Sequence, residues 1–359
     1  MDILIVIPAL NPKNDLIEYV DKLIGNGRSH ILLVDDGSRD DCRFIFDAIE
    51  KKEGCSVLRH EVNLGKGRAL KDAMAWYGKH FLSGTTDPAK TGLAGMITVD
   101  SDGQHSVEDV AKVAAAMEEN PDALILGARD FNTGNVPPKS MFGNKCTRVA
   151  LKLFIGGDIH DTQTGLRGIP NSLIDRFGKL DGDRFEYETV MLIDAIKSHI
   201  DIREVPIQTI YINDNSETHF NPIVDSIKIY RVIFGTFFRY MLSSLSSFLV
   251  DYGIFCALIF AFGKTSFSQS RSVWTATVIS RICSSLFNYT VNRKLVFKSS
   301  RGISTLAMYY ALCIAVMAAS AALVSLAGNT GIPVQIAKII VDTLLFIVSY
   351  RVQKTLIFK

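Results

Sequence analysis

Short apolar runs alternate with helix-like stretches over about the first 210 residues of the chain. The continuous runs are typical of strands covered on both faces, and they lie at Ile3–Ile7, Ile31–Val34, Met96–Val99 and Ala123–Leu126. Helical spacing occurs between them, at Asp15–Ile24, Arg43–Lys51, Lys66–His80 and Val107–Glu119. This alternation predicts an α/β domain with a mainly parallel sheet, whose strand ends form a crevice for a ligand.

After Phe234 the pattern changes to four apolar segments, near 237–262, 273–292, 306–327 and 332–350. Each is close to the roughly 20 residues that a helix needs to cross a bilayer. Between the two regions, apolar residues of Ile223–Phe234 share one helical face, which favours an amphipathic helix at the membrane interface over a plain soluble helix. We therefore expect three parts: an α/β domain at 1–220, an interfacial helix at 221–235 and an all-α transmembrane domain at 236–359.

Charge follows the same division. From Thr236 onward there are twelve Lys and Arg residues and two acids, whereas residues 1–235 carry 35 acids and 27 bases. Cations gather in the 293–301 connection and at the C-terminus, which predicts that both termini and the first domain face the cytosol. The pattern indicates a multi-pass integral protein of the cell (inner) membrane. The acidic first region gives no support for nucleic-acid binding.

Three polar motifs follow buried strands or begin helices. Asp100 and Asp102 are one residue apart at a strand end, so both carboxylates can face one divalent cation such as Mg²⁺ or Mn²⁺. Asp35 and Asp36 also follow a strand and can accept N–H donors of a base or ribose, or simply cap the next helix. The segment 63–69 places glycines and Lys66 at a helix start, which suits an anion.

In their order these motifs resemble the GT-A fold glycosyltransferases of family 2, in the branch related to dolichol-phosphate mannose synthase and bactoprenol glucosyltransferases. The matching segments are 7–11, 35–38, 63–67, 100–104, 127–129 and 161–167. Leu10 and Pro12 replace the Tyr and Glu usual in that family, so the base-stacking aromatic is absent from its usual place. The C-terminal region resembles the GtrA-like four-helix membrane domain, through the Asn292-Arg293-Lys294 pattern and its echo at the C-terminus.

The resemblance implies a role for each matching position. Donor binding falls to Pro8, Ala9, Asp35, Asp36, Lys66, Asp100 and Ser101, and metal binding to Asp100, Asp102 and Gln104. Arg129 and Lys139 would bind the acceptor phosphate. The loop 161–167, with Glu186 and Glu188, would shape the sugar and acceptor side, and Asp161 is the candidate for a supporting carboxylate. Asp102, Arg129 and Asp161 are thus the candidate catalytic residues.

The function implied is inverting transfer of a hexose from a UDP- or GDP-sugar to polyprenyl phosphate, by a chain that forms a homo-oligomer. Two alternatives remain open, namely transfer to another lipid or glycan acceptor, and translocation of a lipid-linked sugar. Four charged residues near the middle of the predicted spans bear on this, because charge is costly there: Asp251, Arg281, Lys338 and Asp342. They either form ion pairs that fix helix packing, or line a polar path or oligomer interface that handles the lipid-linked sugar.

Overall fold

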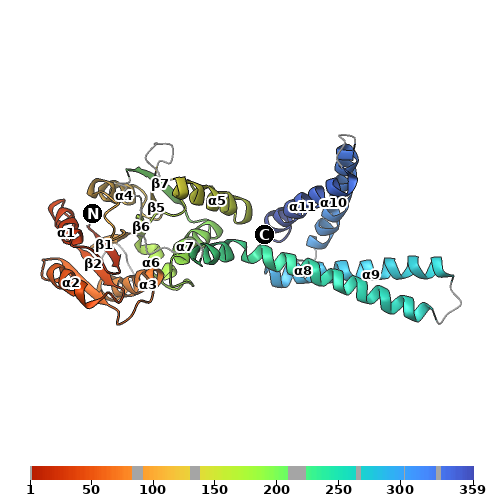
Figure 1. The fold of residues 1–359 in the computed structure, drawn as a ribbon, viewed down its shortest axis with the longest axis horizontal. Coiled ribbons are helices and arrows are strands. Elements are labelled where there is room, and N and C mark those ends of the chain that lie inside the picture. The colour runs from red at the N-terminus through yellow and green to blue at the C-terminus, as the bar shows by residue number, and fades with distance from the viewer. Residues whose placement is uncertain are drawn as a thin grey trace. The chain divides into compact units, whose positions relative to one another are not determined.

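The computed structural model of the chain describes residues 2–82, 92–129, 138–208, 224–263, 268–302, 304–328 and 333–359. For residues 138–140 and 328 the backbone alone is described. The chain divides into two compact units, Met1–Ile233 and Phe234–Lys359. Figure 1 shows strands in the first unit and long helices in the second.

Within the described residues, the first unit contains a seven-stranded sheet with the strand order β3-β2-β1-β4-β6-β5-β7. All neighbouring strands pair in parallel except at β6, which runs antiparallel to both β4 and β5. The strands are β1 (Asp2–Ala9), β2 (Ile31–Asp35), β3 (Cys55–Arg59), β4 (Leu93–Thr98), β5 (Leu124–Arg129), β6 (Arg167–Pro170) and β7 (Ile202–Ile207). The predicted α/β class with a mainly parallel sheet is therefore confirmed.

Helices cover both faces of the sheet, because successive side chains of each central strand point to opposite faces. Ile3, Ile5 and Ile7 of β1 belong to one apolar cluster, and Leu4 and Val6 belong to another. The first cluster includes residues of α1 (Asp15–Gly25), α2 (Arg43–Glu50) and α4 (Val107–Glu119). The second includes residues of α3 (Lys66–Tyr77), α6 (Asn171–Gly178) and α7 (Glu186–Lys197). A further helix, α5 (Pro138–Phe154), follows β5.

The second unit is helical in its described part. Its helices are α8 (Val224–Phe262), which begins before the unit boundary, α9 (Gln269–Val291), α10 (Ser304–Gly328) and α11 (Val334–Val352). Among the described helices, α8 and the Ser304–Ala327 part of α10 are long and apolar enough to cross a membrane. Both α9, which is rich in Ser and Thr, and α11, which carries Lys338 and Asp342, are more polar.

The segment predicted as an interfacial helix over 221–235 is not separate from the following span. One helix continues from Val224 to Phe262 without a break, because its apolar residues continue and Gly235 alone does not end a helix. At about 1.5 Å per residue, its 39 residues are longer than the roughly 30 Å hydrocarbon core of a bilayer. Residues 221–223 lie outside the described residues, and the domain limits at 220 and 235 stay a prediction.

The segments 288–298 and 349–359 are similar in sequence, residue by residue, and we call them the two copies of the repeat. They take the same local structure and contact each other. Each ends in a π-helical turn, η5 (Asn292–Val296) in one copy and η6 (Gln353–Ile357) in the other. Asn292 Nδ2 donates to Gln353 Oε1 across 3.0 Å, and these two amides occupy equivalent positions of the repeat. Phe297 stacks on its equivalent Phe358, with ring centroids 5.4 Å apart. The repeat therefore provides a buried contact between two helix pairs, the first consisting of α8 and α9 and the second of α10 and α11.

Candidate active site

The candidate site lies at one edge of the sheet. The carboxyl ends of β1, β2, β4 and β5 meet there, because these strands are mutually parallel. The antiparallel β6 brings its amino end to the same edge, so the loop 161–166 joins the segments that follow β4 and β5. Strand order reverses direction between β1 and β4, which is the position where open α/β sheets bind ligands.

The segment after β4 presents the predicted metal residues. Asp102 Oδ1 accepts a hydrogen bond from the Gln104 backbone N–H at 3.1 Å, and the Asp100 carboxylate lies 3.6 Å from His105 Nε2. Burial and the nearby Asp100 charge raise the pKa of Asp102. No group of three His, Cys, Asp or Glu residues with metal-ligand geometry occurs in the described part of the chain.

Lys66 is a buried ion-pair partner of this segment. Its Nζ lies 2.6 Å from Asp100 Oδ1 and 3.0 Å from Glu188 Oε1. Burial by itself would lower the pKa of Lys66, but Asp100 and Glu188 together raise it. The pKa of Asp100 is lowered overall, because the Lys66 charge and His105 outweigh the effect of burial. The predicted anion-binding lysine therefore joins Asp100, a predicted metal ligand, to helix α7.

Arg167 is a second buried cation at this edge, fully enclosed by protein. Its Nε donates to the Thr164 carbonyl at 3.0 Å and its Nη1 donates to the Glu188 carbonyl at 2.7 Å. Its Nη2 has no hydrogen-bond partner among the described residues. Burial lowers the pKa of Arg167. Sequence reasoning placed Arg167 in a motif but did not predict its link to Glu188, 21 residues away.

Arg129, at the end of β5, pairs with Asp161 in a two-pronged contact. Nε and Nη2 of the arginine lie 2.6 and 2.9 Å from the two carboxylate oxygens. Asp161 is fully buried and also accepts from the backbone N–H groups of Arg129 and Gln163. Asp161 is thus placed to hold Arg129 in position. A general base would need a carboxylate oxygen open to the substrate, and both oxygens of Asp161 already accept hydrogen bonds. Lys139 lies in α5, and its side chain is outside the described part.

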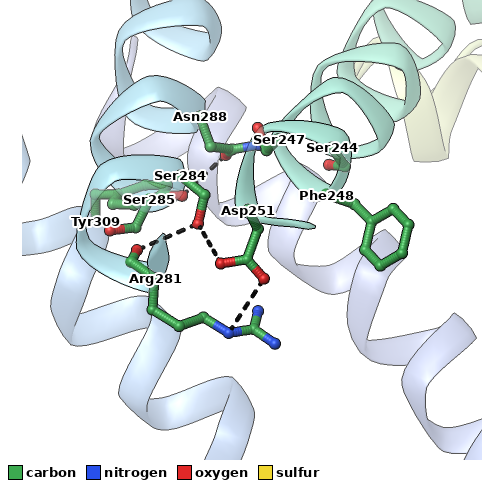
Figure 2. A pocket seen from close by; sticks show the side chains of 9 residues that line it. All are labelled: Ser244, Ser247, Phe248, Asp251, Arg281, Ser284, Ser285, Asn288 and Tyr309. Atoms are coloured by element: carbon green, nitrogen blue, oxygen red, sulfur yellow. Dashed lines mark hydrogen bonds and ion pairs between the residues drawn. The ribbon is translucent and has the colours of Figure 1, made fainter. Parts of the chain in front are cut away.

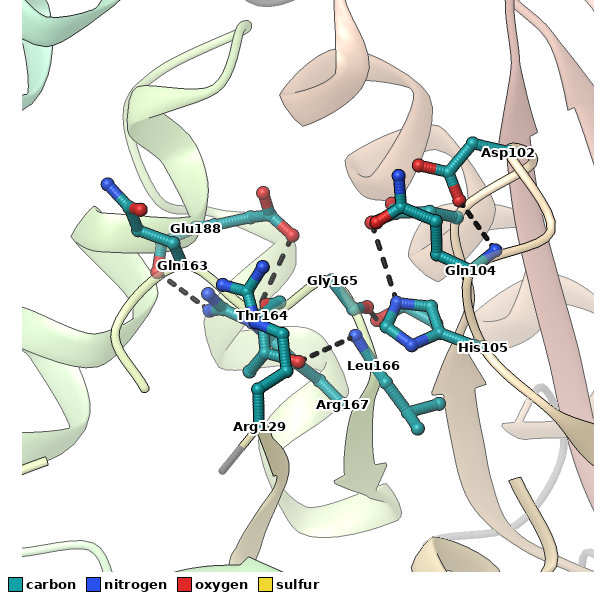
Figure 3. A network of polar contacts seen from close by, with 12 residues as sticks. Asp102, Gln104, His105, Arg129, Gln163, Thr164, Gly165, Leu166, Arg167 and Glu188 are labelled. Carbon is teal, nitrogen blue, oxygen red and sulfur yellow. Dashed lines mark hydrogen bonds and ion pairs between the residues drawn. The ribbon is translucent and has the colours of Figure 1, made fainter. Parts of the chain in front are cut away.

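Gly165 connects the loop 161–166 with the end of β4 and with Asp100, which follows it. Its carbonyl accepts a hydrogen bond of 2.7 Å from Thr98 Oγ1. A Cβ atom at this position would lie 2.1 Å from Asp100 Oδ2, so any other residue would force the Asp100 carboxylate to move. Figure 3 shows Gly165 between the Asp102–Gln104–His105 segment and the side chains of Arg129, Arg167 and Glu188. No local pattern predicts this contact, since Thr98 and Gly165 are 67 residues apart.

The two acids predicted for the nucleoside pocket are hydrogen-bonded to backbone groups. Asp35 Oδ1 accepts from the Ser38 N–H at 2.9 Å. Asp36 accepts from the N–H groups of Leu64 and Gly65 at 2.9 and 2.8 Å, and His60 lies 2.9 Å away. The Asp36 bonds hold the 63–67 loop, and neither acid caps the next helix, because the N-cap of α2 is Cys42 and makes no side-chain cap bond. The roles of the two acids toward a nucleoside stay a prediction. Pro8 and Ala9 end β1 at the same edge.

Comparison with known proteins identifies the class of this chain. Residues 4–178 match the family described as glycosyl transferase family 2, and residues 228–358 match the GtrA/DPMS transmembrane domain. A protein of Methanocaldococcus jannaschii, described as uncharacterised, is 30% identical over 66% of this chain and 93% of its own length. The chain belongs to glycosyl transferase family 2 and is a membrane protein with a GtrA/DPMS transmembrane domain.

Two of the relatives have names that mention a polyprenol-type lipid. The UDP-N-acetylglucosamine–dolichyl-phosphate N-acetylglucosaminyltransferase of Methanococcus voltae is 27% identical, over 64% of this chain and 94% of that protein. The polyprenol monophosphomannose synthase of Mycolicibacterium smegmatis is 24% identical, over 57% of this chain and 76% of that protein. Both names describe sugar transferases or synthases that act on polyprenol-type lipids, and the predicted family resemblance is confirmed.

Proposed function

We propose that this enzyme transfers a hexose from a UDP- or GDP-sugar to polyprenyl phosphate, with inversion at the anomeric carbon. The observation that carries the proposal is that two polar groups, the Asp100–Asp102 segment and the Arg129–Asp161 ion pair, lie at the same edge of the sheet. The first suits a donor diphosphate held through a cation, and the second suits an acceptor phosphate. The names of two relatives support a polyprenyl-type acceptor.

The metal-binding residues fit a hard divalent cation. Burial and the Asp100 charge raise the pKa of Asp102, so a divalent cation beside this carboxyl would favour its ionised form. We propose that Asp100, Asp102 and Gln104 hold Mg²⁺ or Mn²⁺, with Pro8, Ala9, Asp35, Asp36 and Ser101 toward the nucleoside. When bound, the cation would offset the charge of the leaving nucleoside diphosphate.

Positioning supplies the remaining catalysis. A lipid phosphate is ionised near neutral pH, so the acceptor needs little help from a general base. Arg129 would bind the phosphate through guanidinium N–H groups and offset its repulsion by the donor diphosphate. Asp161 fixes the guanidinium plane through its two-pronged contact. Lys139 would add a second cation on the acceptor side.

The membrane arrangement completes the proposal. The cations at 293–301 and at the C-terminus favour a topology in which both termini and the α/β unit face the cytosol, with four spans in the cell membrane. A polyprenyl chain would then lie in the bilayer while its phosphate reaches the crevice. We also propose a homo-oligomer. The alternatives are transfer to another lipid or glycan and translocation of a lipid-linked sugar.

The test is nucleoside-diphosphate release by the full chain in detergent, with Mg²⁺ or Mn²⁺ and a panel of UDP- and GDP-sugars. Release with one donor that requires short-chain polyprenyl phosphate, and that disappears in Asp102→Ala, would support the proposal. Release that is independent of the lipid, or absent with every donor, would favour another acceptor or translocation.

A further inference from the structure

A polar pocket lies among helices of the second unit, in the region of the GtrA/DPMS transmembrane domain. It has a volume of about 290 Å³ and lies between α8 and α9, with one residue of α10 on its wall. Figure 2 shows hydroxyl, amide, carboxylate and guanidinium groups turned toward one another there. The polar lining includes Ser244, Ser247, Asp251, Arg281, Ser284 and Asn288.

The charged pair in this pocket is open. Arg281 Nε lies 3.6 Å from Asp251 Oδ2, which is an ion pair but is longer than a hydrogen bond. The Arg281 side chain is 74% exposed, and its guanidinium makes no hydrogen bond within the described part of the chain. Asp251 is 15% exposed and accepts from Ser284 Oγ at 3.2 Å. Several donors of Arg281 and acceptor sites of Asp251 therefore remain for a ligand.

The second helix pair, α10 and α11, contains an ion pair whose charged atoms are hydrogen-bonded to each other and to a serine. Lys338 Nζ lies 2.8 Å from Ser320 Oγ and 2.9 Å from Asp342 Oδ2, and Ser320 donates to Asp342 at 2.6 Å. The hydrogen bonds of these three side chains close on each other and join α10 to α11. This is the arrangement expected of an ion pair that serves helix packing. The Asp251–Arg281 pair is longer and has fewer hydrogen bonds than this, so helix packing alone does not account for its geometry.

The pocket chemistry selects a class of ligand. Asp251 and Arg281 have opposite charges, so the pocket has no excess cation for a phosphate group alone. Donor and acceptor side chains together line this small volume, which suits the adjacent hydroxyls of a sugar. The exposed ring of Phe248 borders the same space and stacks on Tyr252, with centroids 6.5 Å apart. Charged side chains kept within a membrane domain are commonly functional.

We infer that this pocket binds the hexose headgroup of a polyprenyl-phosphate sugar, as a second site apart from the crevice of the α/β unit. The inference rests on the proposed function, because that reaction would supply the ligand within the membrane. Asp251 and Arg281 would form charge-assisted hydrogen bonds with sugar hydroxyls, and the Ser284 hydroxyl would accept one more. The Asn288 amide already bonds Ser247, Asn292 and Tyr309, so it would offer only its second Nδ2 hydrogen. Unglycosylated polyprenyl phosphate lacks those hydroxyls and should bind here more weakly.

The test measures binding of radiolabelled farnesyl-phosphate glucoside, mannoside and N-acetylglucosaminide to the full chain in lipid nanodiscs. The chain carries Asp102→Ala to prevent turnover, and excess unlabelled farnesyl phosphate occupies the acceptor site. We expect one of the three lipids to bind. Arg281→Gln and Asp251→Asn should each weaken that binding by at least about tenfold, as one charge-assisted hydrogen bond is lost. Lys338→Gln, the matched control in the second helix pair, should leave binding unchanged.

Three results would overturn the inference. The first is unchanged binding in Arg281→Gln and Asp251→Asn, and the second is no binding of any of the three lipids to the parent chain. The third is full recovery of binding in the exchanged pair Asp251→Arg with Arg281→Asp, which would show that the charges serve packing alone. Thermal unfolding verifies that each variant is folded. The probes are synthetic, so this outcome is independent of sugar transfer by the wild-type chain, whose absence would count against the proposed function instead.

Discussion

Lys66 offers a quantitative test of the site, because one cation neutralises two carboxylates there. It lies 2.6 Å from Asp100 and 3.0 Å from Glu188, and the three side chains are 15%, 29% and 11% exposed. Substitution by Met keeps most of the side-chain length and removes the charge. Asp100 and Glu188 would then repel each other without a counter-charge in a largely buried position.

The size of the effect follows from this burial. Removing one partner of a buried ion pair destabilises a protein by about 3–5 kcal/mol, since the remaining charge is left uncompensated. For a unit of this size, 1 kcal/mol corresponds to roughly 2–4 °C in the unfolding midpoint. Lys66→Met should therefore lower the midpoint of the α/β unit by about 6–20 °C. Adding Glu188→Gln to this variant should restore part of the loss, because one of the two repelling charges is removed.

Thermal unfolding of the full chain in detergent, followed by circular dichroism, measures this change. Lys71→Met is the matched control on the same helix. Lys71 is 16% exposed, but its partner Asp183, 2.7 Å away, is 59% exposed. An ion pair with such an exposed partner contributes about 1 kcal/mol or less. Equal midpoints for Lys66→Met and Lys71→Met, or a further decrease on adding Glu188→Gln, would refute the reasoning.

Three further predictions concern the site and the membrane unit. Gly165→Ala, whose Cβ would lie 2.1 Å from Asp100 Oδ2, should reduce kcat about 100-fold or more and raise the Mn²⁺ concentration needed for activation; an unchanged activation curve would contradict this. The pKa of Asp102 is raised and a cation binds its ionised form, so Mn²⁺ affinity, measured by titration, should fall on acidification above the pH range of an ordinary aspartate; a decrease confined to that ordinary range would argue against it. Asn292→Ala removes the 3.0 Å bond to Gln353 and should destabilise the membrane unit by about 0.6–1.7 kcal/mol, measured by unfolding in detergent. Gly235→Ala is the control, because its added Cβ meets open space and should not destabilise the unit. Equal effects of the two substitutions would count against a role for the repeat contact.

Local pattern predicted the central strands and not the rest of the sheet. Strands β1, β2, β4 and β5 consist largely of buried apolar residues, which stand out as continuous runs. The edge strand β3 is only partly buried, β7 carries exposed polar residues, and β6 has four residues. Strands that are this short or only partly buried show no clear periodicity of apolar residues in the sequence. The reversed direction of β6 could not be predicted, since it depends on pairing with strands distant in sequence.

The site shows the same limit. Motifs marked Asp100, Asp102, Arg129 and Asp161, because each lies in a short segment with distinctive chemistry. Their partnerships depend on the tertiary fold. The reversed β6 carries Gly165 to Asp100, and the position of α7 carries Glu188 to Lys66. Asp161 was a candidate supporting carboxylate, and its two-pronged contact now indicates that it acts by holding Arg129.

The most direct test of the central proposal is the fate of the sugar itself. The full chain is given a radiolabelled nucleotide sugar, the donor found active in the release assay, together with synthetic polyprenyl phosphate and Mn²⁺. Label should enter the organic phase as a polyprenyl-phosphate hexose with inverted anomeric configuration, and Arg129→Ala should abolish the transfer. Label that stays in water while nucleoside diphosphate is released, or that enters lipid equally well without polyprenyl phosphate, would contradict the proposed function.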